Sequence, residues 1–375
     1  MRLVAESGLW RIGPAVAEVP LVAVVEVDGA VLAWTVDEEQ ATAQITLTDA
    51  DRADWLWRVL GESGHHAVAT AAAQPAETAA AVDLSGVEVT PGALDGLRRL
   101  AVGHWLRRWW PASIRDGIVG LDAALLDAEI ALVTAHTEDF VGEDSLDADI
   151  AALLAPHADA LAMHLLVGDP RVLELVSRCV RLAQDIGVDA PGWAELADAV
   201  SDRAAAVAAP AHHDDYALAA GSDGGPATAG SIARGATSMA WSGVPGGVFD
   251  AAEDTVRWAV VADDDRVSAV LHIPVIGPGS SDGIPVEFRC GAYIAAGSLD
   301  DAGRAKIDLI DRTSQPVTTA RAWDQDWSST AVVVGAQTTE TAQARDRVRR
   351  FARRRLAEPG PDAYLAEVLA AESDY

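Results

Sequence analysis

Apolar runs and turn residues alternate over the first sixty residues. Two β-branched runs flank Asp28 and Gly29, a pair that favours a type I′ hairpin turn because both central positions take positive φ. Residues 41–48 alternate with period two, which predicts a third strand. An apolar helical pattern then ends at Gly61. We expect residues 1–61 to form a small α+β unit.

The middle of the chain has helical periodicity. Residues 62–89 are expected to be a linker; the few large apolar side chains of 62–82 leave a weak helix as the alternative, and VDLSGVEV (82–89) is a candidate short strand. Thr90 followed by Pro91 is a helix start, because proline at the first helical position loses no hydrogen bond. Five apolar patterns at helical spacing follow, separated by proline and glycine, and predict a helical bundle over 90–208. A Gly- and Ala-rich flexible linker is expected over 209–240.

Short strands dominate after residue 240. Six apolar runs separated by acidic or glycine-containing turns predict an antiparallel β-sandwich over 241–335, with PVTTARAW as the fifth strand. Helical periodicity returns over 336–375, with a break at the Pro-Gly-Pro of 359–361. The expected fold class is therefore multidomain α+β. It has an N-terminal β-hairpin and helix unit, a central helical bundle, and a C-terminal antiparallel β-sandwich followed by a basic amphipathic helix.

Composition excludes several classes of protein. Hydrophobic residues make up 50% of the 375 residues and charged residues 23%. The chain is therefore too apolar for wholesale disorder and too charged for a membrane protein. The formal charge of −29 argues against nucleic acid as a partner, since such proteins need a basic surface to displace counterions. The bias toward alanine and arginine suggests a bacterial source with a GC-rich genome, and a salt-loving source is the alternative. We expect no transmembrane segment and no peripheral membrane contact.

The chain also lacks signs of secretion. Its first residues contain no unbroken apolar region of the kind found in signal peptides. Cys179 and Cys290 form no Cys-x-x-Cys motif, which indicates two reduced thiols in a cytoplasmic protein.

No motif identifies a reaction. The single lysine, Lys306, does not follow a glycine turn, so the chain has no P-loop. Residues 279–283 (GSSDG) match the G-x-S-x-G motif of hydrolases, but a predicted strand follows them and no histidine lies beyond His272. We interpret this segment as a hairpin loop. The histidines form no H-E-x-x-H pattern, and the sequence leans toward a protein that is not an enzyme.

Acidic residues occupy turns between the predicted strands. If those turns meet at one end of the sandwich, their carboxylates could coordinate calcium through oxygen. They lack an EF-hand spacing, and acids are also ordinary turn residues, so we predict no cofactor and keep calcium as an alternative. The candidate metal ligands are Asp263, Asp265, Asp301, Asp324 and Asp326.

Tryptophan and arginine gather in the segment HWLRRWW, and this combination is typical of protein–protein contact surfaces. Core packing with the arginine heads reaching solvent, or a membrane-surface anchor, are the alternatives. The candidate partner-binding residues here are Trp105, Arg107, Arg108, Trp109 and Trp110.

The tail contains an amphipathic basic helix. Residues 345–356 (RDRVRRFARRRL) carry seven arginines and one aspartate, a net charge of +6, which leaves −35 on the rest of the chain. Their apolar residues fall on one stripe. This helix is expected to dock on the acidic body of its own chain, on another subunit, on an acidic partner or on anionic lipid. The candidate partner-binding residues are Arg347, Arg349, Arg350, Arg353 and Arg354.

The leading functional hypothesis is a non-enzymatic scaffold or adaptor in a larger cytoplasmic assembly, with protein partners or self-association. One alternative is a hydrolase that uses the turn carboxylates of the β-region, with or without a metal. Another is a β-sandwich module that binds carbohydrate or peptide through Trp323 and Trp327, which lie four residues apart.

Overall fold

The computed structural model describes residues 1–38, 41–74, 81–141, 143–207, 231–263 and 266–373. The chain forms two compact units. Unit 1 comprises Met1–Trp110, Leu121–Ala205 and Asp346–Tyr375, and unit 2 comprises Pro111–Gly120 and Ala206–Arg345. The chain therefore enters each unit more than once, whereas the segments predicted from the sequence were consecutive. The described residues form helices and three antiparallel sheets, and the fold is multidomain α+β.

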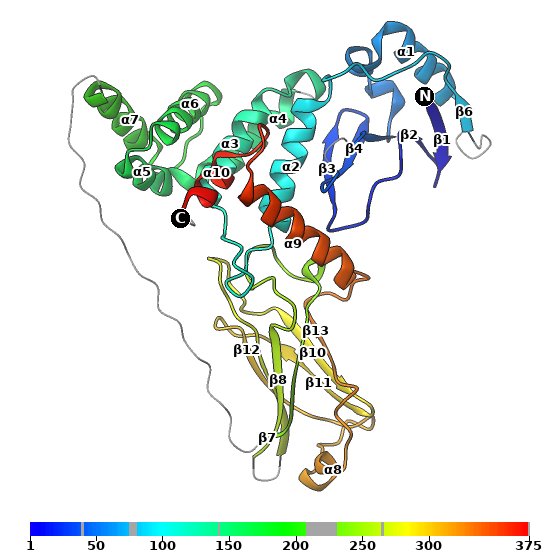
Figure 1. Cartoon of the computed structure of the whole chain (residues 1–375), viewed down its shortest axis with the longest axis vertical. Helices are drawn as coiled ribbons and strands as arrows, with labels where there is room; N and C mark the ends of the chain where they lie inside the picture. Colours follow the sequence, from blue (N-terminus) through cyan, green and yellow to red (C-terminus); the bar gives the residue numbers. More distant parts are fainter. Residues whose placement is uncertain (39–40, 75–80, 142, 208–230, 264–265, 374–375) are drawn as a thin grey trace. The chain divides into compact units, whose positions relative to one another are not determined.

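Unit 1 contains a six-stranded antiparallel sheet in the order β3-β4-β5-β2-β1-β6 (Figure 1). Its strands are β1 (Arg2–Glu6), β2 (Leu9–Ile12), β3 (Val22–Val27), β4 (Ala30–Thr35), β5 (Gln44–Leu47) and β6 (Ala81–Asp83). The predicted hairpin and third strand are present as β3, β4 and β5. The β1–β2 hairpin was not predicted, although Ser7 and Gly8 at its turn have the positive φ values, 52° and 81°, of a type I′ turn. In the β3–β4 turn only Gly29 has positive φ, so the predicted type I′ geometry at Asp28 is wrong.

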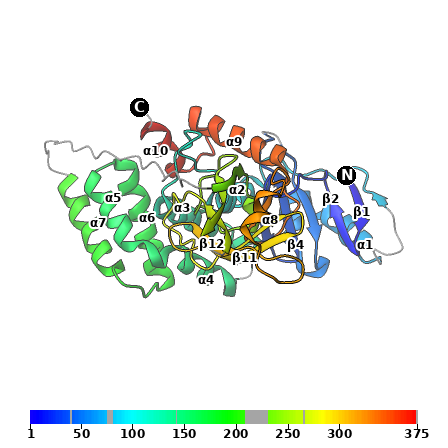
Figure 2. The same ribbon diagram turned by 90° about the horizontal axis from the view of Figure 1, so that it is seen from below.

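Helices form the remainder of unit 1. They are α1 (Leu56–Ala72), α2 (Asp95–Trp109), α3 (Ala123–Ala135), α4 (Glu143–Leu154), α5 (Ala158–Val167), α6 (Pro170–Ile186), α7 (Trp193–Val207), α9 (Ala342–Ala357) and α10 (Leu365–Ser373); α7 and α9 each cross a unit boundary. Helix α2 lies beside β3, and α5, α6 and α7 lie side by side in both views (Figures 1 and 2). Gly103 of α2 is required by close packing, because a Cβ there would lie 2.3 Å from the Tyr364 hydroxyl.

Two expectations for unit 1 change. Of the alternatives for 62–89 the helix is present, as the second part of α1 after a kink at Gly61 (φ 70°), and the candidate strand at 82–89 overlaps the short β6. Small residues such as Gly64 and Ala71 are buried in this part of the helix, so few large apolar side chains were needed. One predicted bundle helix is divided into α4 and α5 by a 3-10 turn around Pro156, which has no N–H for the helical ladder.

A single helical run of the described chain, Leu146–Val167, has the length and apolar composition of a membrane span. Only 33% of its most apolar window is buried, and the turn at Pro156 interrupts it. One such run does not identify a membrane protein, because core helices pass the same test.

Unit 2 is an antiparallel β-sandwich. One sheet has the order β12-β9-β8-β7 and the other β11-β10-β13. The strands are β7 (Ser231–Thr237), β8 (Val256–Asp263), β9 (Arg266–His272), β10 (Pro285–Cys290), β11 (Tyr293–Ser298), β12 (Arg304–Asp308) and β13 (Ala331–Val334). Trp258 of one sheet packs edge-on against the fully buried Phe288 of the other, with ring centroids 5.6 Å apart. The two sheets therefore share one core.

Two strand predictions in unit 2 also change. The predicted strand PVTTARAW contains helix α8 (Thr319–Trp323), because only Val317 and Ala322 are buried there and their spacing does not make a period-two face. The predicted linker over 209–240 contains β7, while its residues 209–230 lie outside the described chain.

Residues 111–120 belong to unit 2, and one carboxylate makes several of the bonds that hold them there. Buried Asp250 accepts hydrogen bonds from the Ser113 hydroxyl at 2.6 Å, the Ile114 N–H at 3.0 Å and the Ala252 N–H at 2.9 Å. These bonds join residues more than 130 positions apart to the same carboxylate, and they hold the inserted segment on the sandwich.

Candidate functional site: a groove at the edge of strand β3

A groove of about 360 Å³ runs beside strand β3 in unit 1. One wall is the strand itself at Val24–Glu26, and a second is the α2 face that carries Leu100, His104 and Arg107. The third wall comes from the end of α3 and from α4. Apolar side chains from three different elements, Leu100, Val141, Leu146 and Leu153 among them, line the groove.

Among the described residues β3 is the terminal strand of its sheet: helix α2 lies beside it, and no described strand pairs with its outer edge. The β3–β4 hairpin closes on the pair Val27–Ala30 around a two-residue turn, and such closing pairs are hydrogen-bonded to each other. Odd-numbered residues of β3 therefore bond to β4, and the even-numbered residues point their N–H and C=O groups outward. The Val36 N–H bonds to the Leu21 carbonyl at 2.9 Å, in agreement with this register.

The outward edge is already used at one end. The Asp28 N–H donates to the Phe140 carbonyl at 3.0 Å, which lies on the same side as the outward groups of Val24 and Glu26. No backbone bond to another element is found for Val24 or Glu26 among the described residues. The strand therefore presents unpaired donors and acceptors next to the groove.

The α2 wall carries a polar network. Arg107 Nε lies 2.9 Å from a carboxylate oxygen of Asp127, whose side chain is 4% exposed, and His157 Nε2 lies 2.9 Å from the other oxygen. Burial, helped by the nearby Arg107 charge, lowers the pKa of His104 from its ordinary value of 6.5. His104 is therefore uncharged at neutral pH, and the positive charge of Arg107 is balanced by Asp127.

Two carboxylates of the groove remain unbalanced. Glu26 of β3 and Asp149 of α4 line the groove and are both exposed. Neither makes an ion pair with any residue that the structure describes. The groove therefore carries net negative charge at neutral pH.

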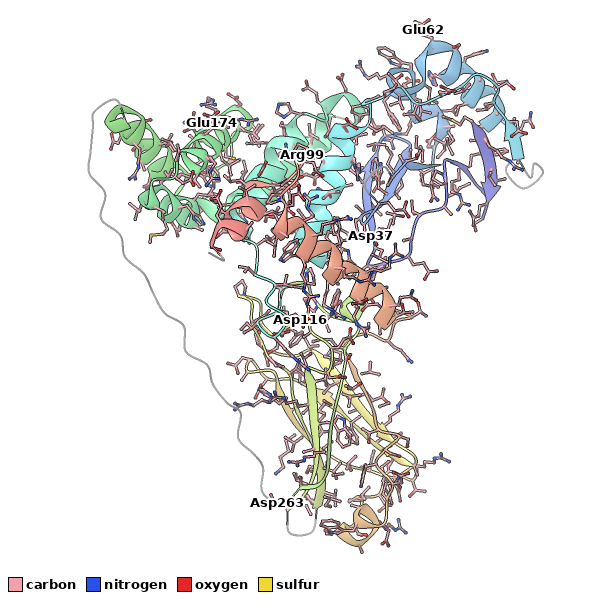
Figure 3. All side chains as sticks on the ribbon, in the orientation of Figure 1. Asp37, Glu62, Arg99, Asp116, Glu174 and Asp263 are labelled. Atoms are coloured by element: carbon pink, nitrogen blue, oxygen red, sulfur yellow. The ribbon has the colours of Figure 1, made fainter. Side chains whose placement is uncertain are left out.

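A second pocket, of about 380 Å³, lies between α2, α3, α6 and α10. Two of its arginines are held in ion pairs. Arg99 (Figure 3) lies 2.5 Å from Glu129, which also accepts the Leu365 N–H at 2.6 Å, and Arg171 pairs with Asp169 and Glu372. Burial raises the pKa of Glu129. These pairs attach α10 to the helices, which is a structural role.

The structure separates the residues of HWLRRWW. Trp105 is 2% exposed and its indole N–H donates to the Pro20 carbonyl at 2.6 Å, and Trp110 is also buried. Arg107 pairs with Asp127, and Arg108 stacks on Trp109 at 4.1 Å from the ring centroid. Core packing thus describes Trp105 and Trp110, and the five residues do not form one exposed surface.

The arginines of α9 are engaged mainly by their own chain. Arg347 makes two hydrogen bonds of 2.8 Å to Asp37 (Figure 3), Arg354 lies 3.4 Å from the Asp37 carbonyl, and Arg350 pairs with Asp346 within the helix. Arg349 is 6% exposed, whereas Arg353 and Arg354 lie on the exposed side.

The acidic turn residues stay apart. Asp263, at the end of β8 (Figure 3), lies 3.3 Å from Lys306, and Asp301 lies in the β11–β12 turn. Asp324 and Asp326 follow α8; the Ser328 N–H bonds to Asp326 and lowers the pKa of its carboxyl. Asp265 lies outside the described residues. The described part of the chain contains no group of three or more His, Cys, Asp or Glu placed to hold a metal ion.

The remaining candidates also have separate positions. Trp323 is 62% exposed, whereas Trp327 is buried against Phe288 and Tyr293. Ser281 of the G-x-S-x-G segment is fully buried and donates to the Asp300 carbonyl at 2.6 Å, as a structural loop residue does.

Sequence reasoning identified β3 as a strand but did not identify the groove. The alternation in LVAVVEV reveals a half-buried strand, while its position at the sheet edge depends on strand order. Comparison with protein-family models, with curated proteins and with solved structures finds no match for this chain.

Proposed function

We propose that this chain is a non-enzymatic adaptor whose unit 1 binds an extended segment of a partner protein as an added strand on β3. The observation that carries this proposal is the outer edge of β3, which pairs with no described strand and faces a groove with apolar walls. Addition of a strand to an exposed sheet edge is a common way for proteins to recognise extended peptides.

The groove supplies both parts of such an interaction. Outward N–H and C=O groups at Val22, Val24 and Glu26 would bond to the added strand and fix its register. Alternate side chains of the peptide would enter the groove against Leu100, Leu146 and Leu153. The backbone hydrogen bonds would contribute most of the affinity. The apolar contacts would determine which peptide side chains are preferred.

We place this activity in the cytoplasm and exclude nucleic acid as a partner. Cys179 and Cys290 are free, buried thiols, which supports a reducing compartment. The net charge of −29 disfavours contact with phosphate backbones.

A displayed library of random heptapeptides, screened on the full chain, tests the proposal. Selected peptides should slow hydrogen exchange at the Val24 and Glu26 amides and leave the Ala23 amide unchanged, since Ala23 already bonds to β4. Failure to select any peptide, or selection of peptides that do not protect these two amides, would overturn it.

A matched pair of variants sharpens the test. Val24→Pro removes an outward N–H that the fold does not use, and edge strands tolerate proline at such positions. We expect it to weaken binding of the selected peptides about tenfold or more, whereas Val24→Ala, which keeps the N–H, should retain binding. If Val24→Pro does not fold, N-methylation of the peptide backbone makes the same measurement on the unaltered protein. Equal binding by the methylated and unmethylated peptides would contradict strand addition.

A further inference from the structure

We infer that the segment bound at β3 is basic, with lysine or arginine alternating with apolar residues. This inference rests on the proposed strand addition and concerns the chemistry of the partner.

The charges that face the groove determine this chemistry. Glu26 and Asp149 are exposed and unpaired within the described chain, and they come from different walls of the groove. The cationic residue of the lining, Arg107, is balanced by the buried Asp127. A cation from a partner would therefore meet two carboxylates without displacing an existing ion pair.

Strand geometry places the partner's basic residue. A peptide residue opposite Glu26 has its Cβ about 5 Å from that of Glu26 on the same face of the sheet, where opposite charges stabilise pairing. A long lysine or arginine side chain there extends toward the opposite groove wall, which carries Asp149. The residues before and after it point to the other face, where Val25 and Val27 of β3 are buried, so apolar residues fit there and the pattern alternates between basic and apolar.

The chain's own basic helix does not supply this ligand. The inner arginines of α9 are held by Asp37 and Glu367, neither of which lines the groove. The acidic charge of the whole chain also favours the approach of a basic segment and disfavours an acidic one.

Three labelled pentapeptides test the inference: Lys-Val-Lys-Val-Lys, Gln-Val-Gln-Val-Gln and Glu-Val-Glu-Val-Glu, each capped at both ends. Fluorescence anisotropy with the full chain at low salt should rank the affinities in that order, with about tenfold or more between the lysine and glutamate peptides. Added salt should reduce the difference.

Charge-neutral variants locate the effect. Glu26→Gln combined with Asp149→Asn should abolish most of the preference for the lysine peptide over the glutamine peptide. Asp147→Asn is the matched control, because Asp147 is exposed on the same helix but does not line the groove. It should leave the preference unchanged.

The outcomes separate this inference from the proposal beneath it. Equal affinity of the three peptides, with protection of the Val24 and Glu26 amides, overturns the basic preference and leaves strand addition standing. A preference that persists in the Glu26→Gln, Asp149→Asn variant also overturns the inference, because the lysine peptide then binds another acidic surface. No binding by any of the three peptides, together with no protection by library-selected ones, overturns both.

Discussion

His104 shows how surroundings decide the chemistry of a single side chain. Its position in α2 is readable from the sequence, and so is Arg107 one turn later. Asp127 and Asp149, which oppose the lowering of its pKa, come from other helices and are brought near it only by packing. From the sequence, isolated histidines are expected to be ordinary structural residues. The lowered pKa of His104 arises only when the helices pack together.

The lowered pKa predicts a pH effect on stability. The unfolded chain binds a proton at His104 near the ordinary pKa of 6.5, whereas the folded chain binds it only at lower pH. The contribution of neutral His104 to the free energy of unfolding is therefore complete above about pH 6.5. It is lost as the pH falls from there toward the pKa that His104 has in the folded chain. Chemical denaturation of the wild type and of His104→Gln at about pH 7.5 and 5.5 checks this. The variant should lose less stability on acidification, and equal losses would contradict the prediction.

Helix α9 shows what an element's own pattern reveals. The sequence predicted an amphipathic basic helix, and Val348, Phe351 and Ala352 are buried along its apolar stripe. Phe351 packs edge-on against Trp105 at 5.4 Å. The expectation that the helix docks on acidic groups did not specify which ones. Those groups, Asp37 and Glu367, lie on other elements, at sequence positions that no pattern in α9 indicates.

Two arginines of α9 should differ sharply in their contribution to the free energy of unfolding. The side chain of Arg355 is 10% exposed and bonds to Glu367, which is fully buried, so Arg355→Ala leaves a carboxylate without its counter-charge. We expect a loss of about 3–5 kcal/mol in the free energy of unfolding. Arg350→Ala is the control, because that side chain is 65% exposed and pairs within the helix; it should cost about 0.5 kcal/mol or less.

Denaturant unfolding measures both variants. A double variant, Arg355→Met with Glu367→Leu, should recover much of the lost stability, since an apolar pair replaces a buried ion pair. Similar small losses for Arg355→Ala and Arg350→Ala would show that Glu367 does not depend on its arginine.

At the scale of the whole molecule, distant segments of the chain assemble each unit. Asp250 attaches residues 111–120 to the sandwich, and residues 346–375 belong to unit 1 with the N-terminal sheet. Each unit has its own buried residues and a buried carboxylate with several partners, Asp250 in unit 2 and Glu367 in unit 1. The contacts that create this arrangement join residues more than a hundred positions apart.

Calorimetry of the full chain should resolve two unfolding transitions. Asp250→Ala leaves the Ser113, Ile114 and Ala252 donors without their acceptor. It should lower the temperature of the unit 2 transition, with a loss of about 2–4 kcal/mol in its free energy of unfolding. Arg355→Ala should lower the other. Asp282→Ala, at an exposed loop position of unit 2, is the control and should change neither. A single transition that responds equally to both buried variants would contradict this independence.

The sequence by itself determined the local elements and the charge. Periodicity predicted the β3–β4 hairpin, the helices from α2 to α10 apart from α8, with α4 and α5 as one pattern that contains Pro156, and most strands of the sandwich. It misassigned α8, and it did not reveal β1, β2 or β7. The tertiary structure alone decided that β3 is an edge strand, that Glu26 and Asp149 share a groove, and that Trp105 is in the core. Side-chain periodicity reports which face of an element is buried, whereas strand order and neighbouring walls depend on contacts between segments distant in the chain.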